Sequence, residues 1–122
     1  MPKTRILLVD DEELIRRSLE VNLRREGFEI FSVASAEAAL ATLQHQPCDL
    51  LLTDYFMEGM TGTDLLKEVK KLYPQIKVII FSGYEKKDSA EEMLRLDADD
   101  FICKPIDFED LLERIAGVLA QK

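Results

Sequence analysis

The sequence contains no long hydrophobic run. None of its apolar stretches approaches the roughly 18 residues that a helix needs to span a bilayer. Its first apolar run, Ile6–Val9, is too short for the core of a signal peptide, and acidic residues follow it directly. From the sequence alone we therefore expect a cytoplasmic protein with no membrane-spanning segment.

Positive charge is also scarce. The 122 residues include 16 Lys and Arg against 24 Asp and Glu, which gives a formal net charge of −8. Domains that contact nucleic acid usually carry a basic face, and an acidic chain is only weakly attracted to anionic lipid. We therefore expect no direct contact with nucleic acid or membrane, and the charge balance favours protein partners and a bound cation.

The chain has only two cysteines and one histidine. Cys48 and Cys103 lie in apolar, strand-like runs and have no second Cys or His at the spacing of metal ligands, so we interpret them as buried, reduced thiols. His45 follows the last apolar position of a predicted helix and is interpreted as an exposed helix-end residue. A phosphodonor histidine, as in a kinase or phosphotransfer protein, is therefore not predicted.

Short apolar runs alternate along the chain with longer segments of helical periodicity. The predicted strands are Ile6–Val9, Phe28–Val33, Leu50–Leu52, Val78–Phe81 and Phe101–Cys103. The predicted helices are Glu13–Glu26, a segment from the N-cap Ser35 to before Pro47, one spanning Leu65–Tyr73, one around Ala90, Met93 and Leu94, and one spanning Phe108–Leu119.

This alternation defines the expected fold class. Five successive strand–helix units predict an α/β, flavodoxin-like, doubly wound fold with a five-stranded parallel sheet in the order 2-1-3-4-5. We expect residues 1–122 to form one domain. Ligands of such sheets bind beyond the carboxyl ends of the strands, so the search for chemistry is confined to a few positions.

Polar residues gather at these carboxyl ends. Asp10 and Asp11 follow the first predicted strand, Asp54 the third, Ser82 the fourth and Lys104 the fifth. Clustered carboxylates resist joint ionisation unless a cation shares the site, and an all-oxygen ligand set favours Mg²⁺. Phosphoryl transfer needs a nucleophile, a metal ion and donors for the equatorial oxygens. Asp54 can be the nucleophile, while Ser82 and Lys104 can contact the transferred group.

Two further acids follow the first strand. We interpret Glu12 and Glu13 as residues that favour the positive N-terminus of the following helix rather than as metal ligands.

At these positions the chain resembles the CheY-like receiver domains of response regulators in two-component signalling. The resemblance covers essentially all of the chain and rests on residues 6–12 (Ile-Leu-Leu-Val-Asp-Asp-Glu), 49–54 (Asp-Leu-Leu-Leu-Thr-Asp), Gly62, 81–84 (Phe-Ser-Gly-Tyr) and 104–105 (Lys-Pro). It implies a phosphoacceptor domain of a phosphorelay, with Mg²⁺ as cofactor and a histidine kinase or phosphotransfer protein as partner. It implies no enzyme beyond self-phosphorylation and slow self-dephosphorylation.

The resemblance also implies a role for each residue. Asp54 would accept the phosphoryl group, Asp11 and the backbone carbonyl of Phe56 would bind Mg²⁺ beside it, and Asp10 would hold a metal-bound water. Ser82 would be the switch hydroxyl and Phe101 the switch aromatic. Lys104 would contact the phosphoryl group, and its bond to Pro105 would be cis.

The chain departs from the family pattern near the acceptor. Glu58 stands where the family usually has Pro, and Phe101 stands where Tyr is common. Phe56 and Tyr84 flank the site, and we expect these bulky residues to slow the loss of the phosphoryl group. Glu58 leaves open a pseudo-receiver that is not phosphorylated and only binds proteins.

Two other classes fit the sequence less well. A flavodoxin-like electron carrier needs a Gly-, Ser- or Thr-rich phosphate loop after the first strand, where this chain has acids. An aspartate-based phosphohydrolase resembles Asp-x-Asp at the nucleophile, and here Phe56 replaces the second Asp.

The resemblance further implies how the signal would leave the domain. The surface of the fourth helix, fifth strand and fifth helix would change on phosphorylation and could form a homodimer. The sequence names no cognate kinase and no output domain.

Overall fold

The structure is a computed structural model that describes residues 3–55, 57, 59–82 and 98–121. Within these residues it contains the strands β1 (Arg5–Val9), β2 (Glu29–Val33), β3 (Leu50–Asp54), β4 (Lys77–Ser82) and β5 (Asp100–Cys103). The helices are α1 (Glu13–Arg25), α2 (Ala36–Leu43), α3 (Gly62–Leu72) and α5 (Phe108–Ala120). The predicted helix around Ala90, Met93 and Leu94 lies outside the described residues.

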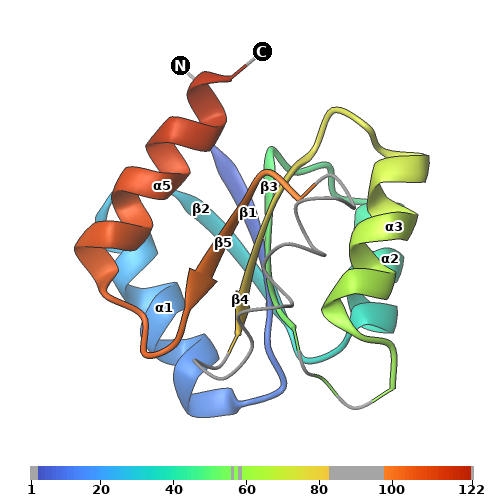
Figure 1. Ribbon diagram of the computed structural model, residues 1–122, viewed down its shortest axis with the longest axis horizontal. Coiled ribbons are helices and arrows are strands. Elements are labelled where there is room, and N and C mark those ends of the chain that lie inside the picture. The colour runs from blue at the N-terminus through green and yellow to red at the C-terminus, as the bar shows by residue number, and fades with distance from the viewer. Residues whose placement is uncertain (1–2, 56, 58, 83–97, 122) are drawn as a thin grey trace.

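The strands form one parallel sheet in the order β2-β1-β3-β4-β5, which confirms the predicted flavodoxin-like topology (Figure 1). The central strand β3 pairs with β1 on one side and β4 on the other, and all five of its residues are buried. A strand covered on both faces needs apolar residues without alternation, which is the pattern that Leu50–Leu52 provides.

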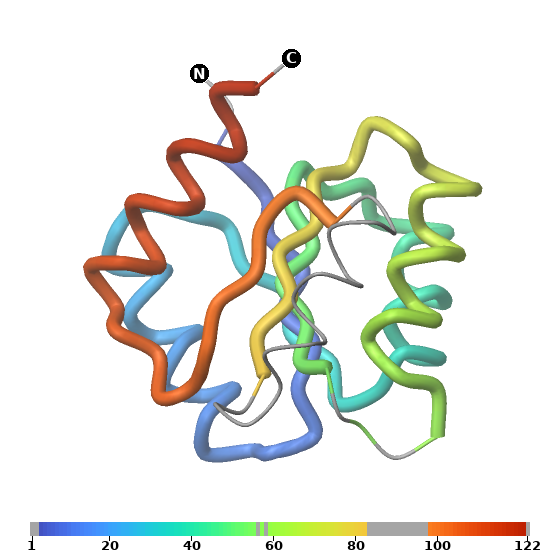
Figure 2. Tube along the Cα trace, in the orientation of Figure 1, coloured from blue at the N-terminus to red at the C-terminus, as the bar shows by residue number. Residues whose placement is uncertain are grey.

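Helices cover both faces of the sheet. In Figures 1 and 2, α1 and α5 lie on one side of the strands and α2 and α3 on the other. Alternate residues of each strand point to opposite faces, so Leu7 and Val9 join the core beneath α2 and α3, whereas Ile6 and Leu8 join the core beneath α1 and α5. The sheet is therefore held between two separate apolar layers.

Local signals fix where several helices begin. The Ser35 hydroxyl accepts a hydrogen bond from the backbone N–H of Ala38 at 3.1 Å, which confirms the predicted N-cap of α2. Thr61 and Asp64 form a capping box at the start of α3. This box fixes the point at which the chain re-enters a helix after β3.

The interpretation of both cysteines as buried thiols was wrong. Cys103 is exposed, because it ends β5 at the edge of the sheet, and Cys48 is only half-buried in the loop before β3. His45 is exposed just after α2, as predicted. Across the described part of the chain, no helix has the length and apolar character needed to cross a membrane.

Candidate functional site

The carboxyl ends of three strands bring acidic and basic side chains together. Asp10 follows β1 directly, Asp54 ends β3 and Lys104 follows β5. Because the strands are parallel, their carboxyl ends lie along the same side of the sheet, which is the lower side in Figure 1. This side is the one that the strand order predicts for ligand binding.

The Lys104 ammonium lies among three carboxylates. Its Nζ is 3.1 Å from Oδ2 of Asp54, 3.5 Å from Oε1 of Glu12 and 4.0 Å from Oδ2 of Asp10. The peptide bond from Lys104 to Pro105 is cis, as predicted, and the Lys104 backbone N–H donates to the carbonyl of Ser82 at 2.6 Å. The backbone thus ties Lys104 to the end of β4.

Asp10 is the most deeply buried acid of the site, with 0% of its surface exposed. Its Oδ1 accepts the backbone N–H of Glu12 at 2.8 Å, whereas Oδ2 receives no hydrogen bond from any described residue. Burial raises the pKa of Asp10 to about 6, and the Glu12 N–H opposes this rise only in part. The side chain of Arg16 donates to the Asp10 carbonyl at 2.8 Å and so braces the end of β1.

Asp54 is 4% exposed, and its pKa is also raised. Burial is the largest cause and the charge of Asp11 adds to it, while Lys104 acts in the opposite direction. Burial disfavours the charge of Lys104, yet Asp54, Asp10 and Glu12 outweigh it and raise the pKa of the ammonium. Lys104 therefore carries its charge at neutral pH.

The arrangement fits a hard divalent cation. Carboxylate oxygens of Asp10, Glu12 and Asp54 lie within 4.8 Å of one another, and Oδ2 of Asp10 is a buried acceptor without a hydrogen bond among the described residues. Oxygen ligands alone are what Mg²⁺ prefers, and a cation would favour the charged form of both aspartates, whose pKa is raised mainly by burial and further by neighbouring acids.

Two other predicted site residues, Asp11 and Ser82, lie at the carboxyl ends of the strands, whereas Phe101 lies two residues before the end of β5. Asp11 is exposed, and its charge reaches Asp54. Ser82 is 1% exposed at the end of β4, opposite Cys103 in the register of β5. Phe101 is half-buried in β5 and packs against the core beneath α2 and α3. Their roles in Mg²⁺ binding and switching stay predictions.

Three predicted modulators are not covered by the structure. Phe56, Glu58 and Tyr84 lie outside the described residues, as does the Phe56 carbonyl that was expected to bind the metal. Their roles likewise stay predictions.

Glu12 is the site residue that the sequence interpretation missed. Its backbone forms the N-cap of α1, as its position suggested, but its side chain makes no capping hydrogen bond and lies near Lys104 instead. The only signal was its place two residues after Asp10, on the same loop. Glu13 does lie in the first turn of α1, where it pairs with Arg17 at 2.9 Å.

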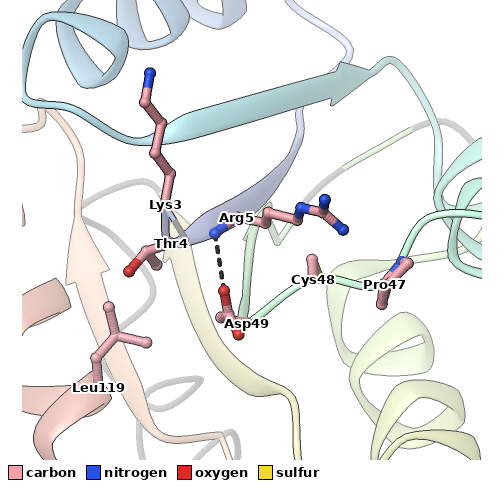
Figure 3. A pocket seen from close by; sticks show the side chains of 7 residues that line it. All are labelled: Lys3, Thr4, Arg5, Pro47, Cys48, Asp49 and Leu119. Carbon is pink, nitrogen blue, oxygen red and sulfur yellow. Dashed lines mark hydrogen bonds between the residues drawn. The ribbon is translucent and has the colours of Figure 1, made fainter. Parts of the chain in front are cut away.

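A hollow of about 600 Å³ lies at the opposite, amino-terminal ends of the strands (Figure 3). The backbone N–H of Arg5 donates to Asp49 at 2.8 Å, and the Arg5 guanidinium pairs with Glu29 at 3.2 Å. Burial raises the pKa of the Cys48 thiol to about 11, so it is protonated and a weak nucleophile at neutral pH. This hollow therefore offers no reactive thiol at neutral pH, and the candidate site is the cluster of Asp10, Glu12, Asp54 and Lys104.

Comparison with known proteins identifies the family. The family model for the response regulator receiver domain matches residues 6–116, and the chain belongs to this family. The response regulator protein FleR of Pseudomonas aeruginosa is 36% identical over 112 residues, which are 92% of this chain and 24% of FleR. The sensory transduction protein RegX3 of Mycobacterium tuberculosis is 35% identical over 116 residues, which are 95% of this chain and 51% of RegX3.

Solved structures agree with this assignment. A CheY-like response regulator receiver domain protein from Methanospirillum hungatei superposes with a TM-score of 0.91 at 36% identity, covering 97% of this chain and 94% of that chain. FixJ-N superposes with a TM-score of 0.90 at 33% identity, covering 100% of this chain and 98% of that chain. The chain thus has the fold of a receiver domain and spans a quarter to a half of the curated relatives described above.

Proposed function

We propose that residues 1–122 form a phosphoacceptor domain in which Asp54 receives a phosphoryl group from a histidine kinase or phosphotransfer protein. The observation that carries this proposal is the position of the Asp54 carboxylate. It is buried at the carboxyl end of β3, 3.1 Å from the Lys104 ammonium and beside the acids that follow β1. A carboxylate in this setting has both a cation and a metal-binding group at hand for the incoming phosphate.

The chemistry follows from these neighbours. An oxygen of Asp54 attacks phosphorus, the bond from phosphorus to the donor breaks, and the donor leaves with that electron pair. The product is an acyl phosphate on Asp54. Asp11, Asp54 and the Phe56 carbonyl would hold Mg²⁺. Asp10 would act through a metal-bound water, with Glu12 close by. The ion would supply positive charge that neutralises the phosphoryl oxygens. Lys104 and Ser82 contact the remaining oxygens from the ends of β5 and β4.

The same site explains why the group is held rather than turned over. A hydrolase needs a positioned general acid or base beside the acyl phosphate, and the sequence offers Phe56 where an aspartate-based phosphohydrolase has its acid. Lys104 has no proton-accepting capacity while charged, so it stabilises the phosphoryl group without activating water. We expect one phosphoryl group for each chain and slow loss.

Phosphorylation would then change a neighbouring surface. The added phosphate brings about −1.5 to −2 charge and three acceptor oxygens, toward which the Ser82 hydroxyl turns. Phe101 would move inward behind it and alter the surface formed by β5, α5 and the helix predicted around Ala90, where a homodimer could form. Signal transfer that persists unchanged in Ser82→Ala and Phe101→Ala would contradict this route.

Intact mass spectrometry tests the proposed function. The protein is incubated with acetyl phosphate and Mg²⁺, and we expect a single labile adduct that is absent from Asp54→Asn and from a sample treated with EDTA. No adduct with acetyl phosphate or with a phosphorylated kinase donor would support a pseudo-receiver instead. An adduct that persists in Asp54→Asn would place the acceptor elsewhere.

A further inference from the structure

The phenyl ring of Phe81 lies beneath the Lys104 ammonium. Nζ of Lys104 is 5.3 Å from the ring centroid, within the range of a cation–π interaction. Phe81 is on β4, one residue before Ser82, and its register partner on β3 is Asp54. The ring is fully buried in the core beneath α1 and α5, so the interior of the domain holds it in place.

Lys104 needs such a fixed contact. A lysine side chain has four flexible carbons, and its ammonium takes whatever acceptors are nearest. The carboxylates of Asp54, Glu12 and Asp10 lie 3.1 to 4.0 Å from its nitrogen. All three belong to the group of acids that fits a divalent cation. Cation binding would therefore weaken the attraction of these acids for Lys104.

The ring differs from the carboxylates in two ways. A hard cation such as Mg²⁺ binds oxygen, so the ring face stays available to Lys104 when the acids are engaged. The ring also carries no net charge, so it attracts the ammonium without repelling an incoming phosphoryl group. Burial of the ring strengthens the attraction, because fewer water molecules compete for the ammonium.

We propose that Phe81 is a positioning residue that holds the Lys104 ammonium beside Asp54 while the surrounding acids are engaged by a cation. This inference rests on the proposed function of Asp54. It assigns to Phe81 an electrostatic role in addition to its packing role in the core.

Fluorination of the ring separates the two roles. Pentafluorophenylalanine at position 81 keeps the aromatic shape but removes the negative face that attracts a cation. The matched control is the same replacement at Phe28, which is half-buried against the same core layer just before β2. Phe81→Leu is a second variant that removes the ring altogether.

The first measurement is the rate of Asp54 phosphorylation with acetyl phosphate and Mg²⁺. We expect fluorination of Phe81 to lower the maximal rate roughly three- to tenfold, with little change in the donor concentration at half-maximal rate. Fluorination of Phe28 should leave the rate within twofold. In a Lys104→Met background, fluorination of Phe81 should have no effect, because the cation is gone.

The second measurement uses the metal-free protein. The ring current of Phe81 should shift the NMR signals of the Lys104 ε-methylene protons upfield, and Phe81→Leu should remove this shift. Wild-type phosphorylation that is insensitive to fluorination, or equally sensitive in the Lys104→Met background, overturns the positioning role alone. Absence of any wild-type adduct overturns the proposed function and the role of the ring with it.

Discussion

The ammonium nitrogen of Lys104 lies 3.1 Å from Oδ2 of Asp54, although the two residues are 50 positions apart in the chain. The contact joins the end of β5 to the end of β3 across β4, which lies between them in the sheet. One lysine thus offsets part of the negative charge of three clustered acids, and the negative charge that remains can attract a cation.

Mg²⁺ should stabilise the folded protein at neutral pH. The acids are brought together only in the fold, so the ion binds the native state and raises the free energy of unfolding by about 2.7 kcal/mol when its concentration is 100 times the Kd. Thermal unfolding with and without Mg²⁺ measures the effect, and EDTA should reverse it. Asp54→Asn should reduce it, whereas Glu26→Gln, an equal charge change at the far end of α1, should not.

The metal-free protein should lose stability as the pH rises from about 4 to 6. The pKa of Asp10 is about 6 in the fold against 3.8 without it, so between these values the folded protein binds more protons than the unfolded chain. The contribution is at most about 3 kcal/mol, complete below pH 4 and lost above pH 6. Asp54, whose pKa is also raised, adds to the slope in the same direction.

Urea unfolding at a series of pH values in EDTA measures this slope. Asp10→Asn should flatten it and should be more stable than the wild type at pH 7, because it buries no charge. A slope of opposite sign, or one unchanged in Asp10→Asn, would contradict the assignment of this pH dependence to the raised pKa of Asp10.

The strand order and the location of the site could be predicted from the sequence. Apolar runs such as Leu50–Leu52 have no alternation, as expected for a strand covered on both faces, and their regular succession with helical segments predicts a parallel sheet. Once the order is fixed, the carboxyl ends of the strands must meet, and Asp10, Asp54 and Lys104 follow.

Side-chain directions could not be predicted in the same way. Glu12 can contact either the N-terminus of α1 or Lys104, and the choice depends on where β5 ends in space. Similarly, Cys103 follows an apolar run, but its exposure depends on β5 being an edge strand. The contact of Phe81 with Lys104 joins two strands and leaves no local pattern in the sequence.

Gly62→Ala should destabilise the domain and displace the acceptor. A Cβ at this position would lie 2.4 Å from the backbone carbonyl oxygen of Asp54, and backbone atoms cannot move aside cheaply. We expect a loss of about 1–3 kcal/mol in the free energy of unfolding and slower phosphorylation of Asp54.

Gly117→Ala is the matched control for this substitution. Gly117 lies in α5, and its added Cβ would meet no described atom within 4 Å. It should stabilise the helix by about 0.5–1 kcal/mol and leave the phosphorylation rate unchanged. Equal effects of the two variants in urea unfolding would rule out a clash at Asp54.

Glu12→Gln should weaken Mg²⁺ binding with little effect on stability. The Glu12 side chain is 60% exposed, so its pair with Lys104 contributes little to folding, and the free energy of unfolding should change by less than about 0.5 kcal/mol. Loss of its charge removes an acid from the cluster and leaves Lys104 closer to Asp10 and Asp54. Both effects weaken Mg²⁺ binding. We expect the Kd to be threefold to tenfold higher, a loss of roughly 1 kcal/mol in binding free energy. Isothermal titration with Mg²⁺ measures this value.

Glu13→Gln removes the same charge one residue further on, where the side chain pairs with Arg17, and should leave the Kd within twofold. If both variants weaken binding equally, the effect comes from net charge and Glu12 has no specific place in the site.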